Sequence, residues 1–196
     1  MKRTGKGIPM KFIKEHSYDI TKLLINQLAM TVFGLVLSLA FNANDTLLLL
    51  VSIFSVCFHA VIVYTVLWDL GSKDGVKGRA RGLVPDYLCG LKIGLLANAV
   101  NALLAILMLI GAIIALSSGR LGALYNIAHT TASLLEAMFL GIVKAVSTGI
   151  GGRTYITETV LYFLAIVPTT AAATLGYVMG YLDKRIFSRF QSTPKQ

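Results

Sequence analysis

Four long apolar runs constrain this chain more than any other feature. They cover 23–41, 46–68, 93–117 and 159–182, and none of them contains lysine or arginine. Each run has about the 20 residues that a helix needs to cross roughly 30 Å of hydrocarbon. With 56% apolar residues, the chain carries more apolar side chains than a soluble domain of this size can bury. The sequence therefore predicts an integral membrane protein.

The placement of the basic residues predicts the orientation. The chain has 18 lysines and arginines and a net charge of +9. If it crosses the membrane four times, 15 of these cations fall on the side of the two termini and only Arg120, Lys144 and Arg153 on the other. Cytoplasmic segments carry such an excess of basic residues. We therefore expect both termini in the cytoplasm, beside anionic lipid head groups, and no binding of nucleic acid, because base-stacking aromatics are not interleaved with the cations.

The sequence predicts one all-α domain, a polytopic membrane helix bundle, over 23–182. A basic interfacial arm, 1–22, precedes it and a basic amphipathic tail, 183–196, follows. The turn formers at 42–45 predict a tight hairpin, and the glycines within 70–91 predict a mobile loop. The expected contacts with lipid head groups are Lys11, Lys14, Arg79, Arg81, Lys184, Arg185 and Arg189.

The segment 121–146 is apolar enough to suggest a fifth crossing, yet it contains His129, Glu136 and Lys144. A fifth crossing would place the basic tail outside, against the charge rule. We therefore expect a hydrophobic helix that lies on the outer surface or dips into the membrane and returns. Backbone at membrane depth that does not span needs protein around it, so this segment should pack against the four helices.

Polar side chains within lipid are costly and mark candidate functional positions. The candidates for an intramembrane polar pathway are His59, Asn98, Asn101, His129 and Glu136. His59 is either part of a proton relay or a neutral imidazole bonded to a neighbour. The two asparagines, three residues apart, share one helix face and are expected to form interhelical hydrogen bonds.

His129 and Glu136 are seven residues apart and fall on one helical face. They could line a proton or cation pathway, or they could form the polar stripe of a surface helix. Glu158 stands in the first turn of the fourth helix, where the helix dipole stabilises an anion.

The fourth helix carries a stripe of small residues, Ala172, Gly176 and Gly180, spaced one turn apart. Such a stripe forms a candidate helix-packing interface, because it lets another helix approach closely. The partner helix could belong to this chain, to a second copy or to another subunit.

The sequence offers no constellation for catalysis. It has no metal-ligand spacing and no recognisable hydrolytic motif, and its two cysteines, Cys57 and Cys89, are expected to stay unpaired. We therefore predict a protein that is not an enzyme and that binds no cofactor.

Four motifs carry a family resemblance: Trp68-Asp69-x-Gly71-x-Lys73-Asp74, Gly90-Leu91-Lys92-Ile93-Gly94-Leu95, Leu124-Tyr125-Asn126 and Gly176-Tyr177-x-x-Gly180-Tyr181. With them the chain resembles a group of four-helix membrane proteins of Gram-positive bacteria that have a similar length and no assigned activity. The resemblance implies a bacterial plasma-membrane location and brings no site residues.

Two functions remain open at this point. The first is association through helix packing with a membrane partner, as in a transporter accessory subunit or an immunity-type protein, and this includes a possible homo-oligomer. The alternative is a small-solute or ion transporter with the polar pathway described above.

Overall fold

The computed structural model describes residues 8–82, 84, 86–118, 122–149 and 155–184. Within these ranges the chain forms helices: α1 (Ile8–Glu15), α2 (Ser17–Phe41), α3 (Asp45–Arg81), α4 (Cys89–Ala97), α5 (Ala99–Ser118), α6 (Ala123–Leu135), the 3-10 turn η1 (Ala137–Phe139), α7 (Leu140–Gly149) and α8 (Tyr155–Tyr181). Four of them, α2, α3, α5 and α8, are long and apolar enough to cross a membrane. The predicted all-α membrane bundle is confirmed.

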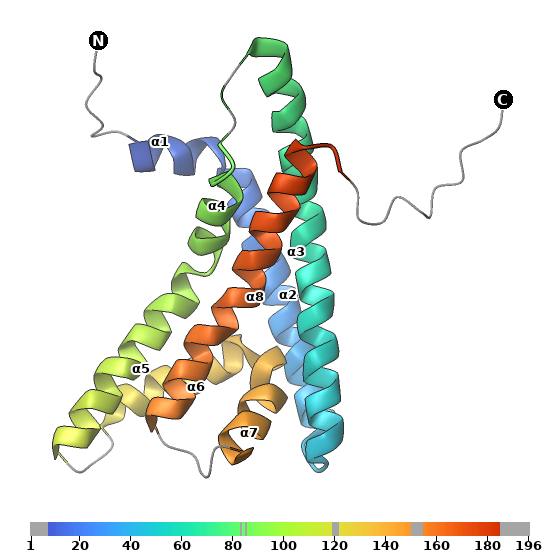
Figure 1. Cartoon of the computed structure of the whole chain (residues 1–196). Helices are drawn as coiled ribbons and strands as arrows, with labels where there is room; N and C mark the ends of the chain where they lie inside the picture. The colour runs from blue at the N-terminus through green and yellow to red at the C-terminus, as the bar shows by residue number, and fades with distance from the viewer. Residues whose placement is uncertain (1–7, 83, 85, 119–121, 150–154, 185–196) are drawn as a thin grey trace.

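The bundle has two distinct ends (Figure 1). One end, here called the α1 end, carries α1, the start of α2, the last turns of α3 and the end of α8. The opposite end, here called the hairpin end, carries the α2–α3 turn together with α6 and α7. At that turn Asn44 Oδ1 accepts hydrogen bonds of 3.1 Å from the backbone nitrogens of Thr46 and Leu47, which caps α3. The predicted tight hairpin at 42–45 is therefore present.

The spanning helices leave most of their surface outside the protein core. Only 28–39% of the most apolar window of each span is buried within the chain. On α5 the exposed side chains are large and aliphatic, such as Leu103, Ile113 and Leu116. An apolar surface of this extent is stable in contact with lipid and not with water. The fold thus supports a multi-pass membrane protein.

The helix pair α3 and α8 packs through glycines in the part of its contact toward the α1 end. A Cβ atom at Gly176 would overlap the carbonyl oxygen of Tyr64, and one at Gly180 would overlap that of Trp68. From the other side, a Cβ at Gly71 would overlap the carbonyl oxygen of Tyr177. Glycine on both helices lets the two backbones touch, which strengthens dispersion in the absence of a hydrophobic driving force.

The same contact explains why α3 is longer than expected. The sequence predicts a helix over 46–68 followed by a mobile loop, whereas α3 continues to Arg81. Gly71, Gly75 and Gly78 are buried and face the end of α8. These glycines, spaced as on one helical face, therefore form a packing stripe and do not break the helix. The expectation of a loop from residue 70 was wrong for this reason.

The predicted third crossing, 93–117, consists of two helices that meet at Asn98. The backbone nitrogen of Asn98 reaches the carbonyl oxygens of Gly94 and Leu96, and its side-chain nitrogen donates to Gly94 O at 2.9 Å. Side-chain competition for backbone carbonyls is a known cause of helix breaks. The amide of Asn98 thus stabilises the break within its own segment and does not take the interhelical hydrogen bond that we expected.

We predict that replacing glycine by alanine at the α3–α8 contact destabilises the fold. Gly71→Ala and Gly180→Ala each add a methyl group against backbone, which should lower stability by about 1–3 kcal/mol. Thermal unfolding of the purified protein in detergent measures the change. Gly122→Ala is the matched control because nothing lies within 4 Å of its Cβ position. Equal melting temperatures for all four proteins would contradict this packing.

We also predict that both ends of the α6–α7 segment face the same side of the membrane. In a chain lacking its native cysteines, single cysteines at Asn126 and Thr148, both exposed, should react with an impermeant maleimide from one side. A cysteine at Ala80 should react only from the opposite side. Labelling of positions 126 and 148 from opposite sides would show that this segment spans.

Candidate functional site

Helices α6 and α7 form a bent hairpin, the shape of a broken span or of a re-entrant loop. The two helices are bent by 83° at η1, and Figure 1 shows both at the hairpin end of the bundle. The tip of the hairpin, Ala137–Phe139, is fully buried in the chain. A buried tip fits the expectation of a segment that dips and returns better than that of a helix lying on the surface.

Contacts with α2 fix the depth of the hairpin tip. The Thr31 hydroxyl donates to the carbonyl oxygen of Leu135 at 2.7 Å, and the Ser38 hydroxyl donates to that of Ala137 at 3.0 Å. Thr31 lies about ten residues, or about 15 Å of helix, before the end of α2 at Phe41. Ser38 lies only about 5 Å of helix before Phe41, so the bend lies between about 5 and about 15 Å from this end of α2.

Contacts with α3 bring the chain back to the surface. The backbone nitrogen of Gly141 donates to Ser52 Oγ at 2.9 Å. One turn later, Lys144 Nζ lies 2.7 Å from Asp45 Oδ1, at the first residue of α3. Since Ser52 is about two helical turns deeper than Asp45 along α3, α7 runs from the membrane interior outward. Backbone at this depth is stable because side chains of α2 and α3 satisfy its polar groups.

Glu136 occupies the bend between α6 and η1. Glu136 is only 2% exposed. Its Oε2 atom has no hydrogen-bond partner among the described residues. Its backbone is satisfied, with the nitrogen bonded to Ala132 O and the oxygen to Phe139 N, both at 2.8 Å. An isolated carboxylate in apolar surroundings is very costly, so this group either keeps a proton or shares its site with a cation.

His59 lies on the buried stripe of α3 that also includes Ser52 and Ser55. His59 is 2% exposed, and neither of its ring nitrogens has a hydrogen-bond partner among the described residues. The structure therefore does not show the expected hydrogen bond between the His59 imidazole and a neighbour. His59 follows Ser52 by seven residues, so it lies about 10 Å further toward the α1 end.

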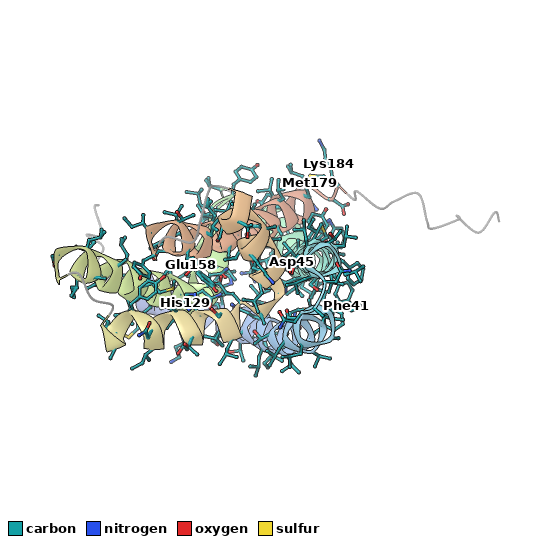
Figure 2. The ribbon with its side chains drawn as sticks, turned by 90° about the horizontal axis from the view of Figure 1, so that it is seen from below. Phe41, Asp45, His129, Glu158, Met179 and Lys184 are labelled. Carbon is teal, nitrogen blue, oxygen red and sulfur yellow. The ribbon has the colours of Figure 1, made fainter. Side chains whose placement is uncertain are left out.

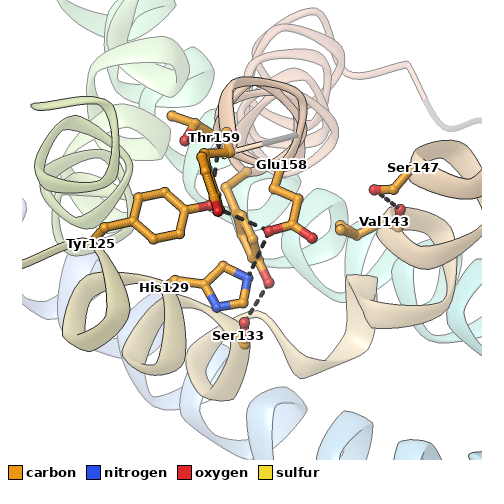
Figure 3. Close-up of polar contacts among 9 residues, drawn as sticks. Tyr125, His129, Ser133, Val143, Ser147, Glu158 and Thr159 are labelled. Carbon is orange, nitrogen blue, oxygen red and sulfur yellow. Dashed lines mark hydrogen bonds and ion pairs between the residues drawn. The ribbon is translucent and has the colours of Figure 1, made fainter. Parts of the chain in front are cut away.

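A second polar cluster, here called the outer cluster, joins α6 to α8 near the hairpin end. His129 Nε2 lies 3.3 Å from Glu158 Oε2, and the Tyr125 hydroxyl donates to the same oxygen at 3.3 Å. Tyr162 shares a hydrogen bond of 2.6 Å with the Ser133 hydroxyl. Figures 2 and 3 show His129 and Glu158 pointing toward each other from the two helices.

The rings of the outer cluster hold the imidazole in place. Tyr125 stacks on His129 with centroids 5.7 Å apart, and Tyr162 meets His129 edge-on at 5.8 Å. The His129 side chain is 33% exposed, whereas that of Glu158 is 13% exposed. The cluster is thus a partly exposed acid–base pair held by aromatic packing.

The candidate pathway residues do not form one continuous cluster. His129 pairs with Glu158, not with Glu136, because α6 ends at Leu135 and the bend takes Glu136 into the interior. Asn98 and Asn101 are both buried near the break between α4 and α5. Within the described part of the chain, no group of three or more His, Cys, Asp or Glu side chains could hold a metal ion.

The other candidate residues take different places. Ala172, Gly176 and Gly180 are buried, and the two glycines meet α3 of the same chain. That stripe is therefore an internal packing surface, one of the alternatives that the sequence left open. Lys14, Arg79, Arg81 and Lys184 are exposed at the α1 end. Arg185 and Arg189, and the side chain of Lys11, lie outside the described residues.

Sequence reasoning missed Tyr125, Ser133 and Tyr162 as members of the outer cluster. A signal for them exists, because Tyr125, His129 and Ser133 follow at intervals of four, as do Glu158 and Tyr162. It also missed the hydroxyls that hold the hairpin. Thr31, Ser38 and Ser52 each stand alone in an apolar run, and their sequence does not reveal which backbone they face.

Comparisons with known proteins add no further constraint. No protein-family model, curated protein or solved structure matches this chain.

Proposed function

We propose that this chain is an ion-transporting membrane protein that conducts protons, with Glu136 as its central proton-binding group. The observation that carries the proposal is the Oε2 atom of Glu136, which is buried without a hydrogen-bond partner among the described residues at the tip of the bent hairpin. Ionisable groups at membrane depth are expensive and occur where protons or ions pass. A purely structural hairpin would be more stable with an apolar residue at this bend.

A proton suits the site better than a metal cation. A sodium or calcium ion needs several oxygen ligands, but the carbonyl oxygens on either side of Glu136 already accept hydrogen bonds from Thr31 and Ser38. A carboxyl group whose Oε2 atom has no hydrogen-bond partner among the described residues can still exchange one proton. His59, with both ring nitrogens without partners, supplies a second such group deeper along α3.

The proposed path begins at the outer cluster. His129 is partly exposed and bonded to Glu158, so the pair can collect a proton from water at the hairpin end and pass it inward. Transfer from the outer cluster to Glu136, and from Glu136 to His59, requires bridging water. Neither Glu136 nor His59 lines the groove between α4 and α8, the cavity at the α1 end or the two cavities beside Lys144. The proposal therefore requires the hairpin to admit water when it conducts.

Association with a membrane partner is the second candidate. An apolar groove of about 600 Å³ between α4 and α8, lined among others by Leu95, Phe163 and Val167, offers a surface for a partner helix. Lipid chains fit the same groove, and the small-residue stripe is already covered by α3. The groove therefore supports this candidate less strongly than Glu136 supports proton conduction.

We predict that Glu136→Gln abolishes proton flux. The amide keeps the shape of the side chain but can neither release nor bind a proton, so the rate should fall at least tenfold, to that of protein-free vesicles. Flux is measured in proteoliposomes with an internal pH-sensitive dye, under a potassium diffusion potential. Asp69→Asn, which changes an exposed carboxylate paired with Lys73, is the control and should conduct normally. Equal flux with glutamate and glutamine at position 136, or no flux with the unchanged protein, would refute the proposal.

The outer cluster should affect the rate without being essential. His129→Asn removes the imidazole and leaves Glu158 to accept protons, so we expect a rate between those of the unchanged protein and the Glu136→Gln variant. Dependence on external pH should weaken as well, because the imidazole at the start of the proposed path is gone. A His129→Asn protein with the full rate and the same pH profile would remove the outer cluster from the path.

A further inference from the structure

A separate cavity of about 480 Å³ lies at the α1 end. Its walls come from α1, the last turns of α3, the start of α4 and the end of α8. Aromatic residues Phe12, Tyr177 and Tyr181 form part of these walls. The cavity shares no residue with the hairpin or the outer cluster, so the proton path does not account for it.

The lining of this cavity is bipolar. Asp74, Lys77 and Arg81 follow one another at about one turn of α3 and so lie along one face of the helix. The Lys77 Nζ to Asp74 Oδ1 distance is 4.0 Å, the outer limit of an ion pair. Asp74 also accepts a hydrogen bond of 3.2 Å from the Tyr177 hydroxyl. Glu15 of α1 and His16 line the same cavity from the opposite wall. The two cations of α3 thus stand among carboxylates, and the cavity presents both signs of charge to a ligand.

The acidic side chain just before α4 already has a cationic partner. Asp86, which also lines the cavity, is already paired with Lys92 at 2.7 Å. The same Lys92 Nζ lies 5.5 Å from the centroid of the Phe12 ring. That contact shows that an aromatic wall of the cavity attracts an ammonium group, as expected from its negative face.

From these charges we propose that the cavity binds a small phosphorylated primary amine, with the ammonium at Asp74 and the phosphate at Lys77 and Arg81. A phosphate monoester carries between one and two negative charges near neutrality, which matches two cations. The ammonium group donates hydrogen bonds to the carboxylate and packs against the aromatic walls. Two carbons between the charged groups span about one helical turn, the spacing of these side chains.

The order of charges along α3 favours a free ligand over a lipid. Asp74 lies nearer to the apolar span than Lys77 and Arg81 do. A ligand that enters from water with its ammonium group first can place that group at Asp74 and its phosphate at Lys77 and Arg81. A membrane lipid with an ethanolamine head group has its phosphate nearer to the bilayer than its ammonium, which is the opposite order.

Binding of ethanolamine phosphate to the full chain in detergent tests the proposal. The compound should raise the melting temperature and give a calorimetric binding signal, whereas ethanolamine alone and glycerol phosphate alone should not. Asp74→Asn and Lys77→Gln should each weaken binding about tenfold, the loss expected for one charge-assisted hydrogen bond. Lys73→Gln is the matched control, because Lys73 pairs with Asp69 outside the cavity.

Any of three results would overturn the proposal. They are no binding of ethanolamine phosphate at millimolar concentration, equally tight binding of ethanolamine alone or glycerol phosphate alone, and an equal loss of affinity in the Lys73→Gln protein. A last arm repeats the titration in nanodiscs of phosphatidylcholine and of phosphatidylethanolamine. Unchanged binding in both supports a free ligand. Loss of binding only in phosphatidylethanolamine shows that the lipid occupies the cavity, which overturns the assignment to a free ligand. None of these results depends on proton conduction.

Discussion

The structure depends on one constraint: backbone at membrane depth has no water to bond with, so the protein must satisfy it. The bent hairpin meets this constraint through side-chain hydroxyls of its neighbours. Thr31 and Ser38 donate to the carbonyl oxygens of Leu135 and Ala137, and Ser52 accepts from Gly141 N. Each unsatisfied group here would cost several kcal/mol. These three bonds therefore fix the hairpin to α2 and α3 and set the depth of its tip.

The same constraint makes the side chains without partners informative. The backbone nitrogen and oxygen of Glu136 are bonded, yet its Oε2 atom and both ring nitrogens of His59 have no hydrogen-bond partner among the described residues. The outer cluster differs, because Glu158 accepts from Tyr125 and pairs with His129. Paired polar groups near the surface are consistent with a stable entrance, whereas the unpaired interior groups have no stabilising role in this state. This contrast is why the proposed function rests on Glu136.

The sequence predicted what depends on composition and periodicity, and missed what depends on three-dimensional contacts. Apolar runs led to the four helices that are long enough to span, and the charge rule led to the prediction that the fifth apolar segment does not span. The same reasoning mistook Gly71, Gly75 and Gly78 for loop formers, because a glycine signals a break or a close helix contact alike until its neighbour is known. Likewise His129 was grouped with Glu136 on one helical face, since the bend after Leu135 leaves no signal in the residue pattern.

The central claim is that the hairpin tip, and Glu136 with it, lies deep in the membrane. The depth of a single tryptophan measures this most directly. In a Trp68→Phe background, tryptophans replace Leu124 at the start of α6 or Leu134 near its end, both exposed. Quenching by lipids brominated at different chain positions then reports depth. The account predicts that position 134 is quenched by deeper bromines than position 124. Equal, shallow quenching at both positions would mean that α6 lies on the surface, and would contradict the account.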